Sequence, residues 1–459
     1  MSELLPDSWE APLLEEIAKV TSGIGFPKDY QGLAEGDLGF FKVGDISKAV
    51  RNHHGHLIQA EHYVSFETAR YLKGNPIAKG STVFAKIGEA IRLNRRAFVD
   101  RPCLIDNNVM AVKADIEEVD RYLYHFLRII DFGPQSRSST VPSLRKGDAE
   151  NLSVPFPPLK EQKRITDKLD ALLKRVDTCR EKLDRIPFIF KRFRQAVLAA
   201  ATSGALTEDW REQKGLSCWE TVNIQHVASK IFDGPFGSHL KSEDYTQTGI
   251  RVARLENIGW LQFFSEKETY ISPEKFRLLE KHTLKAQDIL FSSFVSEEVR
   301  VCLVPSEHSD RIINKADCFC IRADTNICAP AFLAMRLACR STFKIFESKV
   351  HGATRPRINL GQLKAFTFTL PSTTEQLEIV RRVEKLFAFA DHMEARYTTA
   401  RKQVDQLTPS LLAKAFRGEL VEQDPNDEPA AVLLERIKAE RAGQGATKQT
   451  RGRKPKTAE

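Results

Sequence analysis

The sequence predicts an α+β protein: two tandem α+β globules, each followed by a long helix, with the two helices pairing as an antiparallel coiled coil in pseudo-two-fold symmetry. Three observations lead to this fold class. The chain repeats itself, both copies of the repeat contain a heptad pattern, and the remaining segments mix short strand-like and helical runs. We divide the chain into residues 1–158 (globule 1), 159–212 (arm 1), 213–372 (globule 2), 373–424 (arm 2) and 425–459 (a short helix and a basic disordered tail).

The internal repeat is the first observation. The stretch PFPPLKEQKRI at 155–165 returns as TLPSTTEQLEI at 369–379, and a constant shift of 214 positions aligns the two copies without a gap for about 65 residues. A weaker match pairs the segment that begins with Trp9 with the one that begins with Trp219. Solenoid repeats are several times shorter, so the pattern indicates a duplicated globule with its arm.

The heptad pattern predicts the helices. Apolar residues recur in both arms in alternating steps of four and three, over ten positions in each copy. A helix that lies on its own globule is the alternative, but the length of the pattern favours a seam between two helices. Pro187 should break or kink the first helix, about 28 residues after it starts, whereas the second copy has its proline later, at Pro409. The expected seam residues are Ile165, Leu169, Leu172, Val176, Leu183, Ile379, Val383, Leu386, Met393 and Tyr397.

The globules contain short β-rich runs, such as FFKVGDI, STVFAKI and DNNVMAVKA in the first and GIRVARLENI, DILFSSF and CFCIRA in the second. Short helical patterns lie between them, at 119–130 and 331–349. This mixture favours the α+β class for both globules.

Composition sets limits on the function. A net charge of +8 is a mild excess that is compatible with an acidic partner such as nucleic acid. We expect a cytoplasmic protein with no membrane association, because no apolar run reaches the length of a membrane span and the start, MSELLPDSWE, lacks the features of a signal peptide. The eight cysteines lack zinc-site spacing and HHGH at 53–56 is expected to be a surface loop, so we predict no metal site and reduced thiols.

Motifs for catalysis are missing from the sequence. It contains no GxxxxGK[ST] loop, no Asn-Pro-Pro-aromatic motif, no HExxH pair and no glycine-rich nucleophile elbow. We therefore predict that the chain is not an enzyme, and we assign it neither catalytic residues nor a cofactor.

Several motifs together carry a resemblance to a known family. They are SGIGFPKDYQG and FFKVGDI in the first half, GPFGSHLKSEDY and VARLENIG in the second, the two Glu-Gln junctions, and LLAKAFRGELVEQDPNDEPAAVLLERI near the end. With these motifs the chain resembles the specificity subunit of type I restriction-modification enzymes over essentially its whole length.

The resemblance implies that each globule is a target recognition domain that reads one half of a gapped, asymmetric sequence in double-stranded DNA. It also implies that the arms set the gap and bind two methyltransferase subunits, and that restriction/translocase subunits join through the complex. Methylation with S-adenosylmethionine, and cleavage with ATP and magnesium, would then belong to these partner chains.

Arginine and asparagine side chains near strand-like runs are the candidate DNA contacts, because Arg and Asn form bidentate hydrogen bonds with base edges and cations bind phosphates. The candidates are Lys86, Arg92, Asn94, Arg95, Arg96, Asn107 and Asn108 in globule 1, and Arg251, Arg254, Asn257, Arg300, Thr354, Arg355 and Arg357 in globule 2.

Two other functions stay open at this point. A coiled-coil scaffold whose globules bind proteins would show no affinity for DNA. A DNA reader of another defence complex would lack neighbouring genes for a methyltransferase and an ATP-driven nuclease.

Overall fold

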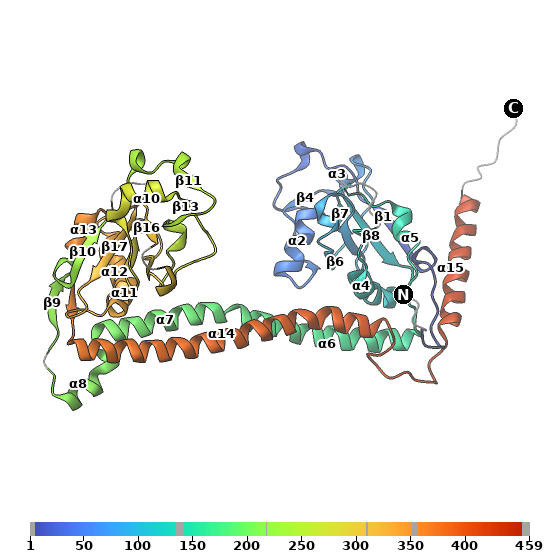
Figure 1. Cartoon of the computed structure of the whole chain (residues 1–459). Coiled ribbons are helices and arrows are strands. Elements are labelled where there is room, and N and C mark those ends of the chain that lie inside the picture. Colours follow the sequence, from blue (N-terminus) through green and yellow to red (C-terminus); the bar gives the residue numbers. More distant parts are fainter. Residues whose placement is uncertain (1–4, 135–141, 217, 309–310, 351–355, 452–459) are drawn as a thin grey trace. The chain divides into compact units, whose positions relative to one another are not determined.

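The computed structural model describes residues 5–134, 142–216, 218–308, 311–350 and 356–451. The chain forms two compact units: unit 1 takes residues 1–182 and 400–459, and unit 2 takes residues 183–399. Each unit holds one globule together with helical segments from both arms (Figure 1). Mixed helix and sheet in both units confirms the predicted fold class.

Globule 1 is built on two sheets. The larger has five strands in the order β1 (Ala18–Ser22), β8 (Val109–Ala114), β5 (Thr82–Ala85), β6 (Arg96–Val99) and β3 (His56–Leu57). The smaller has the order β4 (His62–Val64), β2 (Leu38–Phe41) and β7 (Leu104–Ile105), with β2 antiparallel to β4 and parallel to β7. The helices are α1 (Leu14–Ile17), α2 (Val43–Asn52), α3 (Phe66–Tyr71), α4 (Asp120–Ile129) and α5 (Lys146–Glu150).

Globule 2 repeats this topology with one strand fewer in the first sheet and one more in the second. Its first sheet has the order β10 (Ala228–Phe232), β17 (Cys318–Ala323), β14 (Ile289–Ser292) and β15 (Val301–Leu303). The second has the order β11 (Tyr245–Thr246), β13 (Tyr270–Ile271), β12 (Ile250–Ala253) and β16 (Ile312–Asn314), and β18 (Thr367–Leu370) pairs with β9 (Glu220–Asn223). The helices are α9 (Ile224–Val227), α10 (Pro273–Leu279), α11 (Pro330–Ala338), α12 (Arg340–Glu347) and α13 (Leu360–Lys364).

The central strands of both first sheets are buried on both faces, which is why their sequences are mostly hydrophobic without a polar residue at every second position. All four residues of β5 and all four of β14 are buried. The larger core of globule 1 lies against α4, and that of globule 2 against α11 and α12.

Arm 1 is broken near Pro187, as predicted. Helix α6 (Leu159–Asp184) ends, and α7 (Ile186–Ser203) begins with the proline in its first turn, where the missing N–H leaves no hydrogen bond unmade. Arm 2 is a single helix, α14 (Thr373–Ala415), which continues through Pro409. A short helix, α8 (Glu208–Lys214), follows arm 1.

The arms run antiparallel within each unit. In unit 1, Arg164 of α6 donates a hydrogen bond to the Glu422 carbonyl at 3.4 Å, and Arg180 of α6 donates to Asp405 at 3.3 Å and Thr408 at 3.0 Å. In unit 2, Arg194 of α7 donates to Asp391 at 2.6 Å, and the rings of Phe190 and Tyr397 lie 6.4 Å apart. Rising numbers on one helix meet falling numbers on the other, which confirms the predicted pairing; the pseudo-two-fold relation between the units stays a prediction.

The seam residues divide between two environments. Ile165 and Leu169 are buried in the core of globule 1, and Ile379 and Val383 in the core of globule 2, so the first turns of each arm lie on the preceding globule. A heptad pattern shows that a helix has an apolar stripe but not what covers it. Farther along, the seam is less enclosed: Val176 is buried, whereas Leu172, Leu183, Leu386, Met393 and Tyr397 are half-buried.

The repeated Glu-Gln pair locks each arm to the globule before it. Glu161 accepts a hydrogen bond from the indole of Trp9 at 3.1 Å, and Glu375 accepts the equivalent bond from Trp219 at 3.1 Å. Both glutamates are almost fully buried, so each indole N–H stabilises a carboxylate that water does not reach. This explains why the tryptophans at the starts of the globules repeat along with the junctions.

The glutamine of each pair holds the turn into the helix. The Gln162 side chain donates to the Pro157 carbonyl at 2.8 Å, and the Gln376 side chain donates to the Pro371 carbonyl at 2.9 Å. Proline is not accommodated in the interior of a helix, so each arm helix begins after its proline. The glutamine bond to the proline carbonyl then fixes the direction in which the arm leaves the globule. The same junction therefore occurs twice because each globule is tied to an arm by the same contacts.

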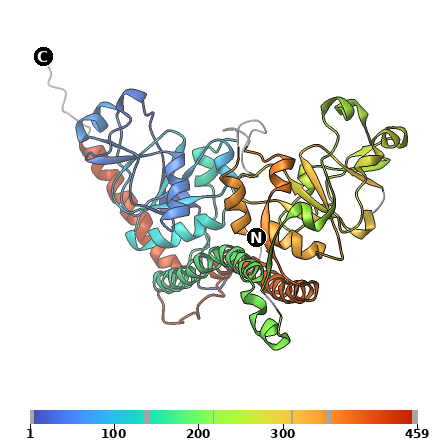
Figure 2. The same cartoon turned by 90° about the vertical axis from the view of Figure 1, so that its left-hand side faces the viewer.

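The C-terminal segment packs on globule 1. Helix α15 (Ala430–Arg451) runs beside that globule in both views (Figure 1 and Figure 2), and its Leu433 and Ile437 are buried in the globule core. Arg441 donates to the side chain of Asp115 and to the carbonyl of Ala18 on the edge strand β1. The helix has 22 residues and is therefore longer than the short helix predicted for 425–459. The part of the predicted basic tail from residue 452 lies outside the described residues.

None of the described helices combines the length and the apolar character that crossing a membrane requires.

Candidate nucleic-acid interface

Three segments of globule 1 meet beyond the end of β5. The backbone N–H of Lys86 donates to the carbonyl of Asn108 at 2.9 Å, and the Lys86 carbonyl accepts from the N–H of Leu144 at 2.8 Å. The N–H of Gly88 donates to the Pro142 carbonyl at 2.7 Å. We call the segments 86–88, 106–108 and 142–144 the loop frame of globule 1.

Globule 2 has the same frame at equivalent positions. The N–H of Ser293 donates to the carbonyl of Asp317 at 2.9 Å, and the Ser293 carbonyl accepts from the N–H of Ile358 at 3.0 Å. The N–H of Val295 donates to the Pro356 carbonyl at 3.1 Å. Segments 293–295, 315–317 and 356–358 therefore form the loop frame of globule 2, and several of the predicted DNA contacts gather on the two frames.

A glycine lets a fourth segment approach each frame. A Cβ on Gly23, just after β1, would lie 2.1 Å from the carbonyl oxygen of Asp106. A Cβ on Gly234, just after β10, would lie 2.1 Å from the carbonyl carbon of Lys315. Only glycine permits such a close backbone approach, which gives the SGIGF and DGPFG motifs a physical reason.

The frame of globule 1 presents amides and a lysine. Lys86 is partly exposed and Asn107 is exposed. Asn108 donates to the Asp106 carboxylate from its backbone N–H at 2.8 Å and from its side chain at 3.2 Å. One amide of the pair is thus held in place while its neighbour is open to a ligand.

The frame of globule 2 presents a carboxylate and an arginine. The buried Ser293 hydroxyl donates to Asp317 at 2.9 Å, and the exposed Arg357 guanidinium lies 3.5 Å from the same carboxylate and 5.5 Å from the ring centre of Phe294. Burial and the charge of Asp317 raise the pKa of Asp233 to about 6. Arg300 is tied nearby to the Leu255 carbonyl and the Ser292 hydroxyl.

Asp317, Asp233 and Ser293 were not among the predicted site residues. The predicted residues are mainly cations and amides, whereas a carboxylate can also orient an arginine through a charge-assisted hydrogen bond. The repeat itself carried the missing signal, since Asp317 occupies the position of Asn108, which was predicted.

The DNA-contact prediction is wrong for Arg96, which is a core residue. Only 3% of it is exposed, and its guanidinium donates to the carbonyls of Leu127 and Ile130 and to the side chain of Asn94. It also stacks 5.0 Å from the ring centre of Phe84. Burial lowers its pKa to about 9, although Asp131 acts in the opposite direction.

Two predicted DNA contacts in globule 2 are also buried. Arg251 is 6% exposed and donates to the Ser265 carbonyl at 2.8 Å. Asn257 is 1% exposed and donates to the carbonyls of Phe264 and Lys267, both at 2.8 Å. Both side chains are buried and hold backbone carbonyls of the largely exposed loop at 264–267, so neither is open to DNA and both predictions are wrong.

The remaining candidates lie outside the frames. Arg92 is exposed and pairs with Glu89, and Arg95 donates to the hydroxyl of Ser47. Asn94 has a φ of 49°, a conformation that asparagine tolerates better than most residues, and Arg254 stacks on Tyr245. Thr354 and Arg355 lie outside the described residues, and a DNA contact by any of these side chains stays a prediction.

Two of the three HHGH histidines lie beside carboxylates. A ring nitrogen of His54 lies 3.3 Å from Asp177 on α6, and one of His56 lies 2.9 Å from Asp100. Among the described residues, no group of three or more histidine, cysteine or acidic side chains is arranged to hold a metal ion.

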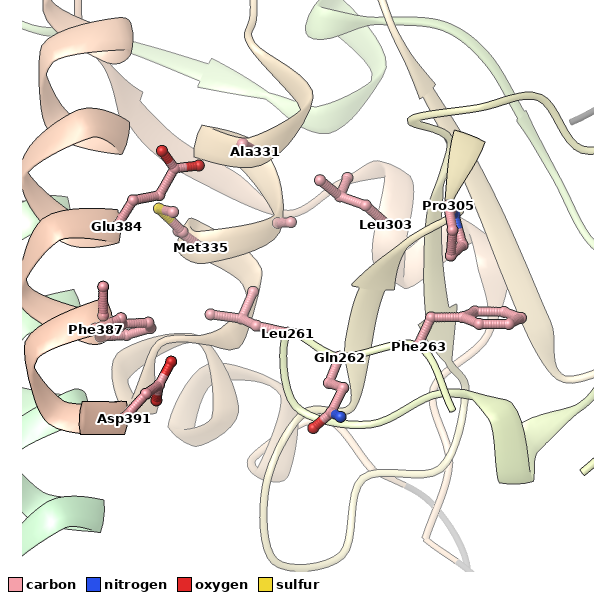
Figure 3. A pocket seen from close by; sticks show the side chains of 12 residues that line it. Leu261, Gln262, Phe263, Leu303, Pro305, Ala331, Met335, Glu384, Phe387 and Asp391 are labelled. Atoms are coloured by element: carbon pink, nitrogen blue, oxygen red, sulfur yellow. The ribbon is translucent and has the colours of Figure 1, made fainter. Parts of the chain in front are cut away.

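A pocket of about 520 Å³ in unit 2 lies apart from the frames (Figure 3). Glu384, Phe387 and Asp391 of α14 form one wall, and Leu261 and Met335 lie opposite. Its described lining has two carboxylates and no cation, so we exclude it from the nucleic-acid interface.

In unit 1, polar contacts join α6 to α4 at the position that corresponds to this pocket. Asp170, which the repeat aligns with Glu384, accepts from Arg121 at 2.6 Å and lies 2.8 Å from a ring nitrogen of His125. Both partners belong to α4, the counterpart of α11.

The fold and the two loop frames define a protein with two equivalent binding globules on paired helical arms. Residues 6–187 and 219–399 match the model of the type I restriction modification DNA specificity domain. Two curated relatives from Escherichia coli are similar over almost the whole chain. The EcoBI specificity subunit is 30% identical, covering 97% of this chain and 95% of its own, and the EcoDI subunit is 32% identical, covering 97% and 98%.

Two solved structures share the fold. A chain from a study of the complex assembly and conformational transition of the type I R-M system has a TM-score of 0.66 at 18% identity, covering 91% of this chain and all of its own. The HsdS subunit from Thermoanaerobacter tengcongensis has a TM-score of 0.55 at 18% identity, covering 91% and 99%. The chain belongs to the family of type I restriction-modification specificity subunits, and it is a DNA specificity subunit of such a system.

Proposed function

We propose that each globule reads one half of an asymmetric, gapped target in double-stranded DNA. The observation that carries this is the repeated loop frame, which has the same backbone bonds in both globules but different side chains. A shared backbone indicates a shared task, and different side chains indicate different half-sites. The full target is therefore not a palindrome.

The partners follow from the same architecture. Each unit offers the same kind of helical segment, one stretch of arm 1 beside one stretch of arm 2, and this supports two methyltransferase subunits bound in equivalent ways. The arms then set the distance between the half-sites. Restriction/translocase subunits join through this complex in the cytoplasm.

The chemistry belongs to the partner chains in this proposal. S-adenosylmethionine serves the methyltransferase subunits, and ATP and magnesium serve the restriction subunits. This chain contributes recognition and spacing.

The test is a long-read methylome of cells that co-express this chain with its methyltransferase, compared with cells that lack this chain. We expect one gapped, asymmetric methylated motif that disappears without the chain. An assembled complex that methylates no such motif would favour a protein scaffold, and a palindromic motif would contradict different half-sites.

A further inference from the structure

The two loop frames differ in sequence at most positions, and three of these equivalent positions carry polar side chains of different chemistry. The Lys86 backbone bridges Asn108 and Leu144, and the Ser293 backbone bridges Asp317 and Ile358, so the frames correspond position by position. Ser143 and Arg357 precede these last residues and form equivalent bridges, to Ile87 and Phe294. The backbone bonds thus align one set of three side chains in each globule while leaving their identities independent.

Each set contains one cation, but the two sets hold it at different positions, and only the set of globule 2 contains a carboxylate. In globule 2, a long exposed cation extends beside a fixed carboxylate, since Asp317 accepts from Ser293 at 2.9 Å and lies 3.5 Å from Arg357. In globule 1, a serine takes the place of the arginine and a neutral amide that of the carboxylate. A guanidinium oriented by a carboxylate suits the two acceptors of guanine in the major groove, whereas globule 1 carries its cation, Lys86, at a different position of the frame.

We propose that these three side chains, which we call the frame trio, select one base pair in the half-site of their own globule. The trios are Lys86, Asn108 and Ser143 in globule 1, and Ser293, Asp317 and Arg357 in globule 2. In globule 2, Arg357 donates to guanine while Asp317 orients it. This inference rests on the proposed reading of one half-site by each globule.

The variants follow from the repeat, because each globule supplies the replacement for the other. Arg357→Ser installs the residue of globule 1 and removes the donor. Asp317→Asn also installs the residue of globule 1, and asparagine tolerates the φ of 69° at this position, so the backbone is kept. Arg277→Ser, an exposed arginine of α10 outside the frame, is the matched control.

The experiment reads the methylome of cells that co-express each full-length variant with the methyltransferase. We expect Arg357→Ser to relax discrimination at one base pair by about 10- to 100-fold, in one half-site only. Asp317→Asn should relax the same base pair by a smaller factor. The other half-site, the gap and the Arg277→Ser motif should stay unchanged.

The outcomes separate this inference from the proposed function. A wild-type chain with no gapped motif would reject the proposed function itself. A wild-type motif that Arg357→Ser leaves intact would reject only the trio. If Arg357→Ser abolishes methylation at every site, the binding of the purified complex to target and non-target DNA is measured at several salt concentrations. This measurement distinguishes a base contact from a phosphate contact. Equal weakening on both would show a phosphate contact and overturn the proposal.

Discussion

At the scale of single residues, Arg96 shows how globule 1 accommodates a buried cation. Its guanidinium makes hydrogen bonds to Leu127, Ile130, Asn94 and the Arg95 carbonyl, and its Cζ lies 5.0 Å and 4.9 Å from the ring centres of Phe84 and Phe132. The fork geometry of arginine reaches several separate acceptors at once, which a lysine ammonium cannot do. Arg96 thus connects β6 to the end of α4.

We expect Arg96→Lys to lower the free energy of unfolding of unit 1 by about 2 to 4 kcal/mol, because carbonyls lose their donors in a buried place. Urea unfolding with hydrogen exchange of α4 measures the effect. Arg92→Lys, on the exposed Glu89 pair, is the control and should change stability by less than about 0.5 kcal/mol. Similar losses in both variants would contradict the core role.

His125 predicts a pH dependence of unit 1. It is 1% exposed and faces Asp170, Arg121 and Arg128. Burial and the two arginines lower its pKa to about 4, against the opposing effect of Asp170. Between about pH 6.5 and 4 the unfolded chain takes up a proton that the folded chain does not, so unit 1 loses on the order of 3 kcal/mol as the pH falls through this window.

The variant His125→Gln tests this linkage, because it keeps an N–H for Asp170 and has no titrating ring. We expect the wild-type chain to lose stability relative to the variant between pH 7 and 4, with both unfolded in urea at each pH. A constant difference across this range would show that His125 does not titrate with folding.

At the scale of elements, the two Glu-Gln junctions share the bond from a tryptophan but differ in the number of hydrogen bonds that the glutamate accepts. Glu375 accepts from Trp219, Thr207 and Arg211. Glu161 accepts from Trp9 through one oxygen, and its other oxygen, Oε1, is buried without a hydrogen bond in the described part of the chain. Burial raises the pKa of Glu161, although the bond from Trp9 lowers it.

We therefore expect Trp9→Phe to destabilise its junction by about 3 kcal/mol and Trp219→Phe by about 1 kcal/mol, because Glu375 keeps two donors and Glu161 loses its indole partner. Hydrogen exchange at the starts of α6 and α14 measures each junction separately. The two variants control each other, since the ring change is the same. Equal effects would mean that the indole bonds contribute alike.

The elements also show what the sequence could predict. The repeat and the heptads predicted both arms, because these depend on local periodicity, and Pro187 by itself predicted the break in the first arm. They could not predict that Ile165 and Ile379 belong to the globule cores, since burial depends on what the fold places beside a helix. For the same reason Arg96 and Asn107 were equally good candidates for DNA contacts in the sequence, yet Arg96 is buried and Asn107 is exposed. The sequence could not predict the loop frames, because they consist of backbone hydrogen bonds between segments that are far apart in the chain.

At the scale of the whole molecule, the repeat separates the residues that hold the fold from the side chains that differ between the two globules. The residues that hold the backbone are shared: the tryptophans, the Glu-Gln pairs and the glycines Gly23 and Gly234. The side chains on the loop frames differ. Half-site and gap should then change independently, because they depend on different parts of the chain.

Lengthening the arms tests this independence. Adding one heptad to arm 1 near Arg180 and one to arm 2 near Asp405, which face each other in unit 1, keeps the antiparallel register. Seven residues add about 10 Å of helix, so we expect the gap of the methylated motif to widen by up to about three base pairs while both half-sites stay the same. The control adds the heptad to arm 1 alone, which shifts the seam and should abolish methylation. An unchanged gap with both insertions would mean that the arms do not set the spacing, and altered half-sites would mean that recognition is not confined to the globules.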